Sequence, residues 1–173
     1  TYEETLEINL SLVIPEIGNF RINIYRQRGS MALVARYVSF NIPNLKDLNL
    51  PPFLYDLIME KRGLILVVGP TGSGKSSTLA AMLNHRIATK TGHVLTLEDP
   101  VEFMFRHNKS IVSQRDIGLD SLSYPNALKS ALRQAPDCIL IGEIREAQTM
   151  TMAMNFALSG HLCLATLHAN NTY

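Results

Sequence analysis

The residues with the clearest chemical meaning are eight consecutive positions, Gly69 to Ser76, that match the pattern G-x-x-x-x-G-K-[ST]. Glycines at three of these positions allow successive backbone N–H groups to turn inward and bind phosphate oxygens. Lys75 would reach the β- and γ-phosphates of a nucleotide, and the Ser76 hydroxyl would ligate Mg²⁺. The predicted nucleotide-binding residues are Gly69, Pro70, Thr71, Gly72, Ser73, Gly74, Lys75, Ser76 and Ser77.

The flanking sequence favours this interpretation over a glycine-rich turn that binds nothing. An apolar run of β-type residues, 64–68, leads into the motif, and apolar residues follow it at helical spacing. A helix that begins near Lys75 would add its positive N-terminal end to the phosphate site. Strand, loop and helix therefore occur in the order that a phosphate-binding loop requires.

Hydrolysis of a bound nucleotide also needs metal ligation and a group that aligns water, and two acidic segments offer both. In the first segment, Glu98, Asp99 and Glu102 lie within five residues at the end of a predicted strand. Pro100 takes the chain out of regular structure there, at the strand edge where open α/β sheets bind ligands. A solvated acidic turn is the alternative interpretation.

The second acidic segment, residues 137–145, carries Glu143 just after a buried strand. A carboxylate in that position is predicted to hold Mg²⁺, directly or through water. The alternative for Glu143 is an acid that only interacts with the dipole of the following helix. Thr166, His168 and Asn170 lie at the end of the last predicted strand, where a polar group could sense a γ-phosphate, although a lone histidine is usually structural.

These residues need a scaffold, and the hydrophobic pattern predicts a parallel α/β sheet. Short apolar strands alternate with helices, which implies strands covered on both faces. The predicted strands are 64–68, 93–97, 110–113, 137–141 and 161–166, and the predicted helices are 75–88, 124–134 and 146–159. A short helix at 53–61 is predicted to precede them.

The first 40 residues have a different pattern, which predicts a small antiparallel sheet with a polar, arginine-bearing face. The strands are predicted at 5–14, 19–26 and 31–40, with a turn at Gly29-Ser30. Residues 41–52 contain three prolines and little periodicity. This composition is typical of a linker between two lobes.

Composition limits the possible functions. The chain has 173 residues, enough for one domain with a small lobe, and its net charge of +1 gives no reason to expect a nucleic-acid partner. Cys138 and Cys163 occur in apolar runs and indicate buried thiols in a reducing compartment. No apolar run approaches the ~20 residues needed to cross a bilayer. We therefore expect a cytoplasmic protein that meets a membrane only through its partners.

Four segments, in order, resemble the motifs of a known family. Residues 69–76, 96–103, 135–145 and 159–171 are similar to the Walker A motif, Asp box, Walker B motif and His box of the secretion ATPases. These are the RecA-like hexameric motors of type II secretion and type IV pili. Phe20-Arg21-Ile22-Asn23 and the run from Cys163 to Asn171 look most like the pilus-retraction branch, the PilT/PilU group.

This resemblance implies a fold. The class would be α/β, with residues 53–173 forming part of a RecA-like P-loop NTPase core. Residues 1–40 would form part of a small N-terminal PAS-like α+β lobe, and 41–52 would be the linker between the lobes. Both lobes would be truncated, because the chain stops directly after the His box whereas family members continue.

The resemblance also implies roles for individual residues. Glu102 would be the catalytic glutamate of the Asp box, and Glu143 would be the Walker B glutamate in the Mg²⁺ shell. His168 would be one of the two histidines of the His box. Arg21 and Arg36, carried by the small lobe, would approach the phosphates when the lobes close.

The function implied by the resemblance is Mg²⁺-dependent ATP hydrolysis by a homohexamer that drives type IV pilus retraction and twitching motility. The expected partners are an inner-membrane pilus platform protein and other pilus motor ATPases, with no nucleic acid. The protein would be cytoplasmic and peripheral to the inner membrane. The alternatives are a pilus-assembly or type II secretion ATPase, or a low-activity nucleotide-binding partner of a true retraction motor.

Overall fold

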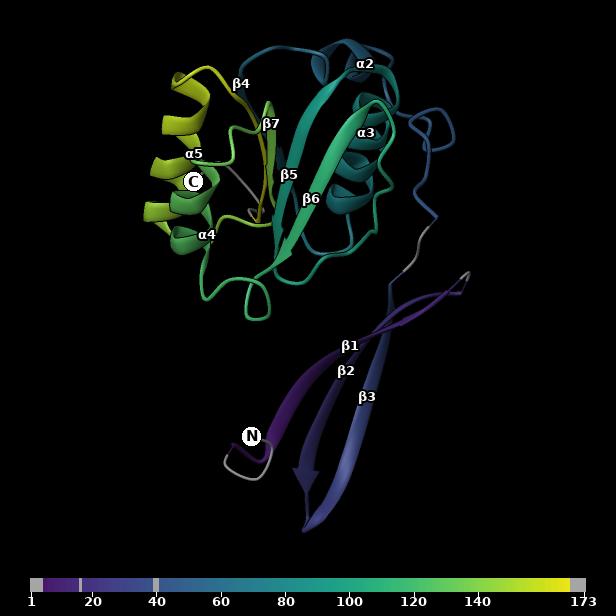
Figure 1. The fold of residues 1–173 in the computed structure, drawn as a ribbon. Coiled ribbons are helices and arrows are strands. Elements are labelled where there is room, and N and C mark those ends of the chain that lie inside the picture. The colour runs from purple at the N-terminus through teal and green to yellow at the C-terminus, as the bar shows by residue number, and fades with distance from the viewer. Residues whose placement is uncertain (1–4, 16, 39–40, 169–173) are drawn as a thin grey trace. The chain divides into compact units, whose positions relative to one another are not determined.

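A computed structural model of the chain, which describes residues 5–15, 17–38 and 41–168, divides into two compact units. The first unit is Thr1–Asn41 and the second is Ile42–Tyr173. Figure 1 shows the first as a ribbon of long strands and the second as a sheet with helices on both faces. The candidate site lies in the second unit.

The first unit contains a three-stranded antiparallel sheet in the order β1-β2-β3, as predicted. Its strands are β1 (Glu7–Ile14), β2 (Gly18–Gln27) and β3 (Ser30–Val38). The turn between β2 and β3 consists of Arg28 and Gly29, with φ angles of 50° and 80°, and not of Gly29 and Ser30 as predicted. A two-residue loop with two positive φ angles matches the right-handed twist of its flanking strands, which explains why the turn lies one residue earlier than predicted.

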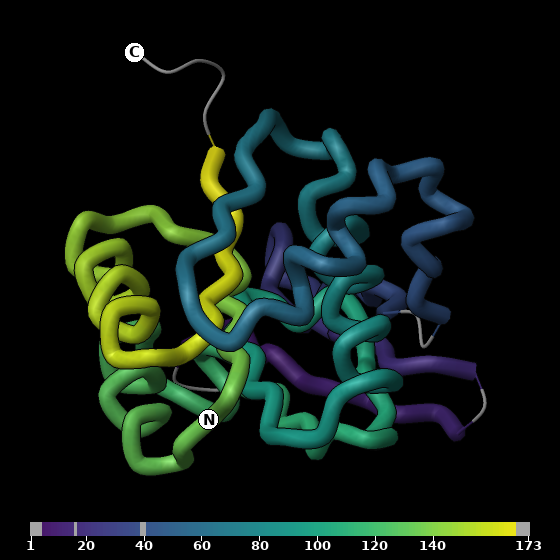
Figure 2. Tube along the Cα trace, turned by 90° about the horizontal axis from the view of Figure 1, so that it is seen from above, coloured from purple at the N-terminus to yellow at the C-terminus, as the bar shows by residue number. Residues whose placement is uncertain are grey.

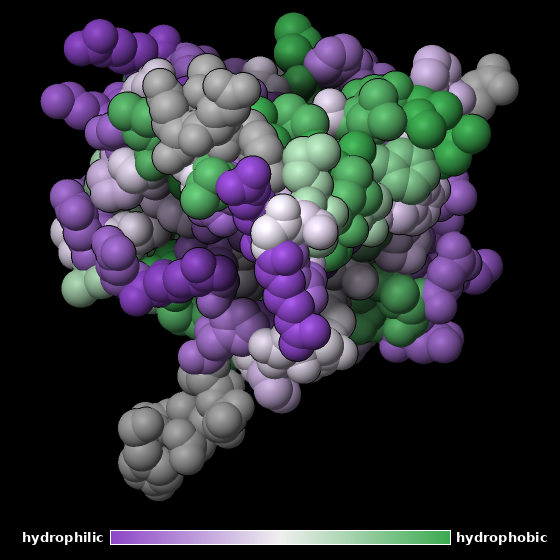
Figure 3. Space-filling view, turned by 90° about the horizontal axis from the view of Figure 1, so that it is seen from below, coloured by the Kyte–Doolittle hydropathy of each residue, from purple (hydrophilic) through white to green (hydrophobic). Residues whose placement is uncertain are grey.

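Apolar side chains of this sheet reach the surface. Leu12 is 49% exposed and Leu33 is 57% exposed, and Leu10 and Val34 are similarly open. Figure 3, a view from below, shows green hydrophobic side chains at the surface beside purple hydrophilic ones. The described strands of the first unit therefore leave apolar surface uncovered.

The second unit is built on a five-stranded, all-parallel sheet in the order β4-β8-β7-β5-β6. Its strands are β4 (Gly63–Val68), β5 (Gly92–Glu98), β6 (Ser110–Asp116), β7 (Cys138–Ile141) and β8 (Leu162–Leu167). Its helices are α2 (Phe53–Leu57), α3 (Lys75–Thr89), α4 (Tyr124–Ala131) and α5 (Ala147–Leu158). Every predicted strand and helix of this region is present, so the α/β class is confirmed.

Helices cover both faces of the parallel sheet, and each face has its own hydrophobic core. Helices α2 and α3 lie on one face, and α4 and α5 lie on the other (Figures 1 and 2). Leu79, Met82, Leu83 and Ile87 of α3 are each at most 1% exposed, which confirms the predicted apolar face of this helix. Burying one such side chain is worth about 1.5–3 kcal/mol, so these four residues hold α3 and the loop before it firmly on the sheet.

Element boundaries in the second unit differ from the predicted ones by three residues or more at three places. Helix α2 ends at Leu57 instead of residue 61, and α4 ends at Ala131 instead of residue 134 because its last turn tightens into three-residue hydrogen bonds. Strand β6 continues to Asp116, where it still pairs with the end of β5. Among the described residues, no helix combines the length and the apolar character that crossing a bilayer requires.

Residues 41–52, the predicted linker, contain no helix or strand. Leu45 is nevertheless only 2% exposed and belongs to the core under α2 and α3, and Leu48 and Leu50 pack against the same core. From Ile42 onward the segment is part of the second unit. It is therefore anchored to that unit and is not a free connection.

Candidate active site

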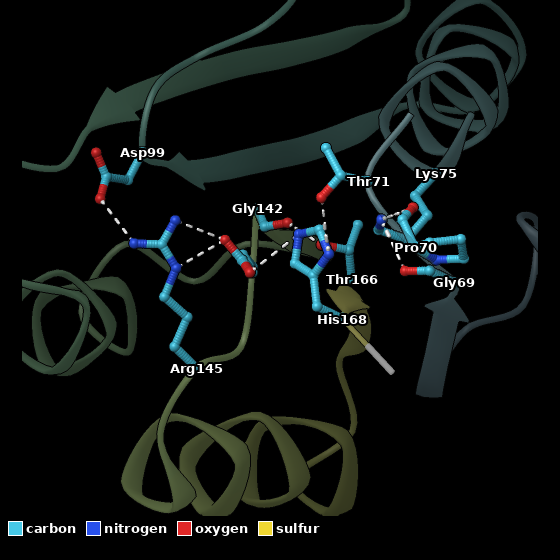
Figure 4. A network of polar contacts seen from close by, with 10 residues as sticks. Gly69, Pro70, Thr71, Lys75, Asp99, Gly142, Arg145, Thr166 and His168 are labelled. Carbon is cyan, nitrogen blue, oxygen red and sulfur yellow. Dashed lines mark hydrogen bonds and ion pairs between the residues drawn. The ribbon is translucent and has the colours of Figure 1, made fainter. Parts of the chain in front are cut away.

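The phosphate-binding loop connects the end of β4 to the start of α3. Gly72 and Gly74 have φ angles of 79° and 88°, a region that residues with a side chain rarely adopt. Lys75, only 8% exposed, folds back so that its Nζ donates to the carbonyl oxygens of Gly69 (3.0 Å) and Pro70 (2.8 Å). Figure 4 shows this ammonium group held inside its own loop, close to the carboxyl edge of the sheet.

Three strand ends meet at the carboxyl edge of the sheet beside this loop. The N–H of Gly142 donates to Leu97 O at the end of β5 (2.7 Å), and the N–H of Ile144 donates to Thr166 O in β8 (3.0 Å). The Thr166 hydroxyl donates back to the carbonyl of Gly142. The segment that follows β7 is thereby tied to both neighbouring strands, and it carries Glu143, which lies close to His168.

A chain of polar contacts runs along this edge from Asp99 to the phosphate-binding loop (Figure 4). Glu143 Oε2 accepts from Arg145 Nε and Nη2, both at 2.7 Å, and Arg145 Nη1 lies 3.8 Å from Asp99 Oδ2. Glu143 Oε1 is 3.1 Å from His168 Nε2, and His168 Nδ1 is 3.5 Å from Thr71 Oγ1. The four segments that the sequence singled out are therefore joined by direct contacts.

Glu98, the last residue of β5, is a buried acid at this edge and is only 7% exposed. One of its carboxyl oxygens accepts from the N–H of Glu102 (3.3 Å), whereas Oε1 has no hydrogen-bond partner. Burial raises the pKa of Glu98 above its ordinary value. Glu98 lines a small cavity together with Ser76, Gly142 and Thr166. An incompletely satisfied buried carboxyl in such a place is characteristic of a ligand-binding site.

Gly142 allows Glu98 to occupy this position. A Cβ atom at residue 142 would lie 3.1 Å from Glu98 Cα and 3.3 Å from its Cβ and Cγ. The close approach of β5 thus favours glycine at the position that separates β7 from Glu143. In the sequence alone, Glu98 is only one of three clustered acids. The signal that distinguishes it is that it directly ends an apolar strand, whereas Glu102 follows Pro100.

The structure brings together most of the predicted site residues of the second unit. Ser76 lines the cavity beside Glu98, and Glu143 is in contact with His168. Glu102 is half-buried and contacts Glu98 through its backbone, and its catalytic role stays a prediction. Ser77 lies in the first turn of α3. The predicted contribution of Asn170 falls outside the described residues.

Arg21 and Arg36 lie in the first unit, on β2 and β3. They are direct partners in the strand register, so their side chains project from the same face of the antiparallel sheet. Arg21 is half-buried and Arg36 is exposed. Their approach to the phosphates stays a prediction.

A family model described as Type II/IV secretion system protein matches residues 10–173. The chain belongs to this family. The Pseudomonas aeruginosa protein named Type IV pilus ATPase PilU is 49% identical over 170 residues, which are 98% of this chain and 44% of that protein. The protein of the same organism named Type IV pilus retractation ATPase PilT is 41% identical over 170 residues, covering 98% of this chain and 49% of its own length.

A solved structure agrees with these sequence relationships. The crystal structure of the pilus retraction motor PilT with bound ADP matches this member of the type II/IV secretion family with a TM-score of 0.93 at 46% identity. The match covers 98% of this chain and 49% of that one. The chain thus spans about half the length of the relatives that it matches.

The acidic edge of this secretion-family chain offers few protein ligands for a metal. Among the described residues, no group of three or more His, Cys, Asp or Glu side chains is arranged to hold a metal ion. The Ser76 hydroxyl and the Glu98 carboxyl, which line one cavity, are oxygen donors of the kind that Mg²⁺ prefers. Mg²⁺ is commonly bound by one or two protein groups together with substrate phosphates, so these residues fit a metal that arrives with a nucleotide.

Proposed function

We propose that the full-length protein is an ATP-hydrolysing motor that drives type IV pilus retraction. The observation that carries the proposal is the convergence of a phosphate-binding loop with two strand-end acids, Glu98 and Glu143, at one edge of a parallel sheet. A loop without such acids could bind a nucleotide without hydrolysing it. The likeness to proteins named as a pilus ATPase and a pilus retraction ATPase supports the choice of reaction and machine.

Nucleotide binding would use the loop residues 69–77. Backbone N–H groups and the N-terminal end of α3 would bind phosphate oxygens, and Lys75 would leave its two carbonyl partners to meet the β- and γ-phosphates. Mg²⁺, held by the Ser76 hydroxyl and by Glu143 directly or through water, would neutralise charge that develops during phosphoryl transfer. Glu98, with its unpartnered oxygen in the cavity beside Ser76, is a further candidate for this shell.

Glu102 would orient or polarise the attacking water, because this half-buried glutamate is tied through its backbone N–H to Glu98 of the same acidic segment. His168 would report on the γ-phosphate, since its ring connects Glu143 to Thr71 of the phosphate-binding loop. A histidine that contacts both the metal-binding acid and the phosphate-binding loop can transmit the loss of a phosphate to the rest of the site.

Arg21 and Arg36 would act as arginines that reach the phosphates when the two lobes close. Their side chains project from the same face of the antiparallel sheet, so one anion near that face would meet both guanidinium groups. On this proposal residues 1–40 are part of a PAS-like lobe, 41–52 connect the lobes, and 53–173 are part of a RecA-like motor core.

The assembled state would be a homohexamer in the cytoplasm, bound to the inner membrane through a pilus platform protein and acting with other pilus motor ATPases. Nucleic acid is not an expected partner, because the net charge of +1 offers no electrostatic attraction for it.

The test of direction is the removal of the protein from its own pilus-bearing cell. Loss of a retraction motor leaves pili extended and abolishes twitching, whereas loss of an assembly motor leaves cells without pili. Cells without pili, or cells with normal pili that fail to export proteins, would contradict a role in retraction. The third possibility, a low-activity partner, predicts that the purified full-length protein turns over little ATP by itself and that it stimulates a second motor.

A further inference from the structure

Arg145 has no role in the function proposed above, yet it forms the shortest ion pair among the described residues of the site. Its Nε and Nη2 atoms both lie 2.7 Å from one oxygen of Glu143. The guanidinium is planar, so two donors that converge on one oxygen fix the position of that oxygen. The contact also joins opposite charges, the guanidinium of Arg145 and the carboxylate of Glu143.

The contacts of Arg145 and Glu143 extend in both directions along the sheet edge. Arg145 Nη1 is 3.8 Å from Asp99, which belongs to the acidic segment after β5. The second oxygen of Glu143 is 3.1 Å from His168, which follows β8. Glu143 is therefore held at both oxygens, by a cation on one side and by an imidazole on the other, and Figure 4 shows Arg145 and His168 on opposite sides of this contact.

The two side chains differ in exposure, which indicates that the contact matters more for the orientation of Glu143 than for the packing of Arg145. The Arg145 side chain is 62% exposed, so it contributes little packing, whereas the Glu143 side chain is 19% exposed. An exposed ion pair adds only about 0.2–1 kcal/mol to stability. The contact therefore contributes little to the stability of the fold. Its main effect is to restrict the orientation of the half-buried Glu143 carboxylate.

We propose that Arg145 is a positioning residue that holds Glu143 in the orientation needed for nucleotide hydrolysis. The proposal rests on the proposed function, because it assigns Glu143 to the shell of the metal. A glutamate has several rotatable bonds, and a free one samples many orientations. Groups that orient a metal-binding side chain typically change metal affinity or activity by about 10–100-fold when they are removed.

The experiment compares Arg145→Ala and Arg145→Lys with a matched control, Arg62→Ala, in the full-length protein. Arg62 is exposed and directly precedes β4. It therefore lies at the amino-terminal ends of the parallel strands, whereas the site lies at their carboxyl ends. Arg145→Ala should lower kcat by about 10–100-fold with KM for ATP changed by no more than about threefold. Arg145→Lys should recover little, because a lysine cannot place two donors on one oxygen. The control should match the wild type.

A double-mutant cycle with Glu143→Ala separates positioning from any other effect of Arg145. Once the carboxylate is gone, Arg145→Ala should cost no further activity. A loss of the same size in both backgrounds, or an unchanged kcat in the single variant, would overturn the proposal.

A binding measurement keeps the inference separate from the proposed function. Mn²⁺ binding in the presence of ADP, followed by electron paramagnetic resonance, should weaken by about tenfold in Arg145→Ala and stay unchanged in Arg62→Ala. A folded wild-type protein that does not hydrolyse ATP would refute the proposed function, and the Mn²⁺ measurement would still decide the role of Arg145. Equal Mn²⁺ affinities for the wild type and Arg145→Ala would refute the positioning role.

Discussion

Replacing Gly142 by alanine should both destabilise the protein and slow nucleotide hydrolysis. The new Cβ would lie 3.1 Å from Glu98 Cα and 3.3 Å from its Cβ and Cγ, a few tenths of an ångström closer than ordinary contacts. Gly142 cannot move away easily, because its N–H is bonded to Leu97 and its carbonyl to Thr166. The end of β5 must therefore shift, and the carboxyl of Glu98 shifts with it.

Two opposing effects set the magnitude of the stability change. Overpacking a well-packed site costs about 1–3 kcal/mol. Gly142 is not among the glycines with positive φ, so alanine can adopt its backbone conformation and restrict the unfolded chain, a gain of about 0.4–1 kcal/mol. The middle of each range gives a net loss of about 1.3 kcal/mol, and the melting temperature should fall by about 3–5 °C for a chain of this length.

The assay is differential scanning calorimetry with steady-state ATP turnover measured well below the melting temperature. Gly29→Ala is the control, because this glycine has a φ of 80° in the hairpin of the first unit and open space around it. That variant should lose about 1–2 kcal/mol through backbone strain while kcat is unchanged. A melting temperature for Gly142→Ala equal to or above that of the wild type would refute the packing argument, and a normal kcat would refute the importance of Glu98.

Three further predictions concern charged residues. Burial raises the pKa of Glu98, so the folded state binds this proton more tightly than the unfolded state does, and the free energy of unfolding should fall as pH rises from the ordinary value of a glutamate through the raised one. Glu98→Gln should flatten that part of the stability–pH curve and raise the melting temperature near neutral pH while lowering kcat, and a lower melting temperature would contradict this account. Glu102→Gln should retain ATP with near-normal affinity but hydrolyse it slowly, whereas Glu143→Gln should need far more Mg²⁺; superimposable Mg²⁺ titrations would show that the assigned roles are wrong. Arg36→Ala and Arg21→Ala should each lower kcat far more than ATP affinity, by up to about 10³–10⁵-fold for a residue that stabilises the transition state, and an unchanged kcat in both would identify them as surface arginines.

The parallel sheet and its helices were predictable because their signal is local. The apolar spacing of Leu79, Met82, Leu83 and Ile87 specifies one face of a helix, and the same face is buried in the structure. The phosphate-binding loop was equally accessible, since its glycines and lysine are contiguous in the sequence. Prediction succeeded where the residues that determine an element or a motif lie close together in the sequence.

The details of the acidic edge could not be predicted, because they depend on contacts between strands that are distant in the chain. Nothing in the sequence near Glu98 indicates that Gly142 packs against it. Leu45 was likewise not predicted to be buried, because the proline-rich composition around it is typical of a linker. The partnership of Arg145 with Glu143 needs the precise course of the chain after β7. The arginines of the first unit show the same limit, because a strand pattern fixes their face and not what that face meets.

The most direct test of the account is phosphate release from ATP by the full-length protein, compared with its Lys75→Ala variant, with and without Mg²⁺. Lys75 is buried in the phosphate-binding loop, and no other side chain of the described loop can replace its charge opposite the β- and γ-phosphates. We expect Mg²⁺-dependent turnover by the wild type and turnover at background level by a folded Lys75→Ala protein. Equal rates for the two proteins would contradict this expectation.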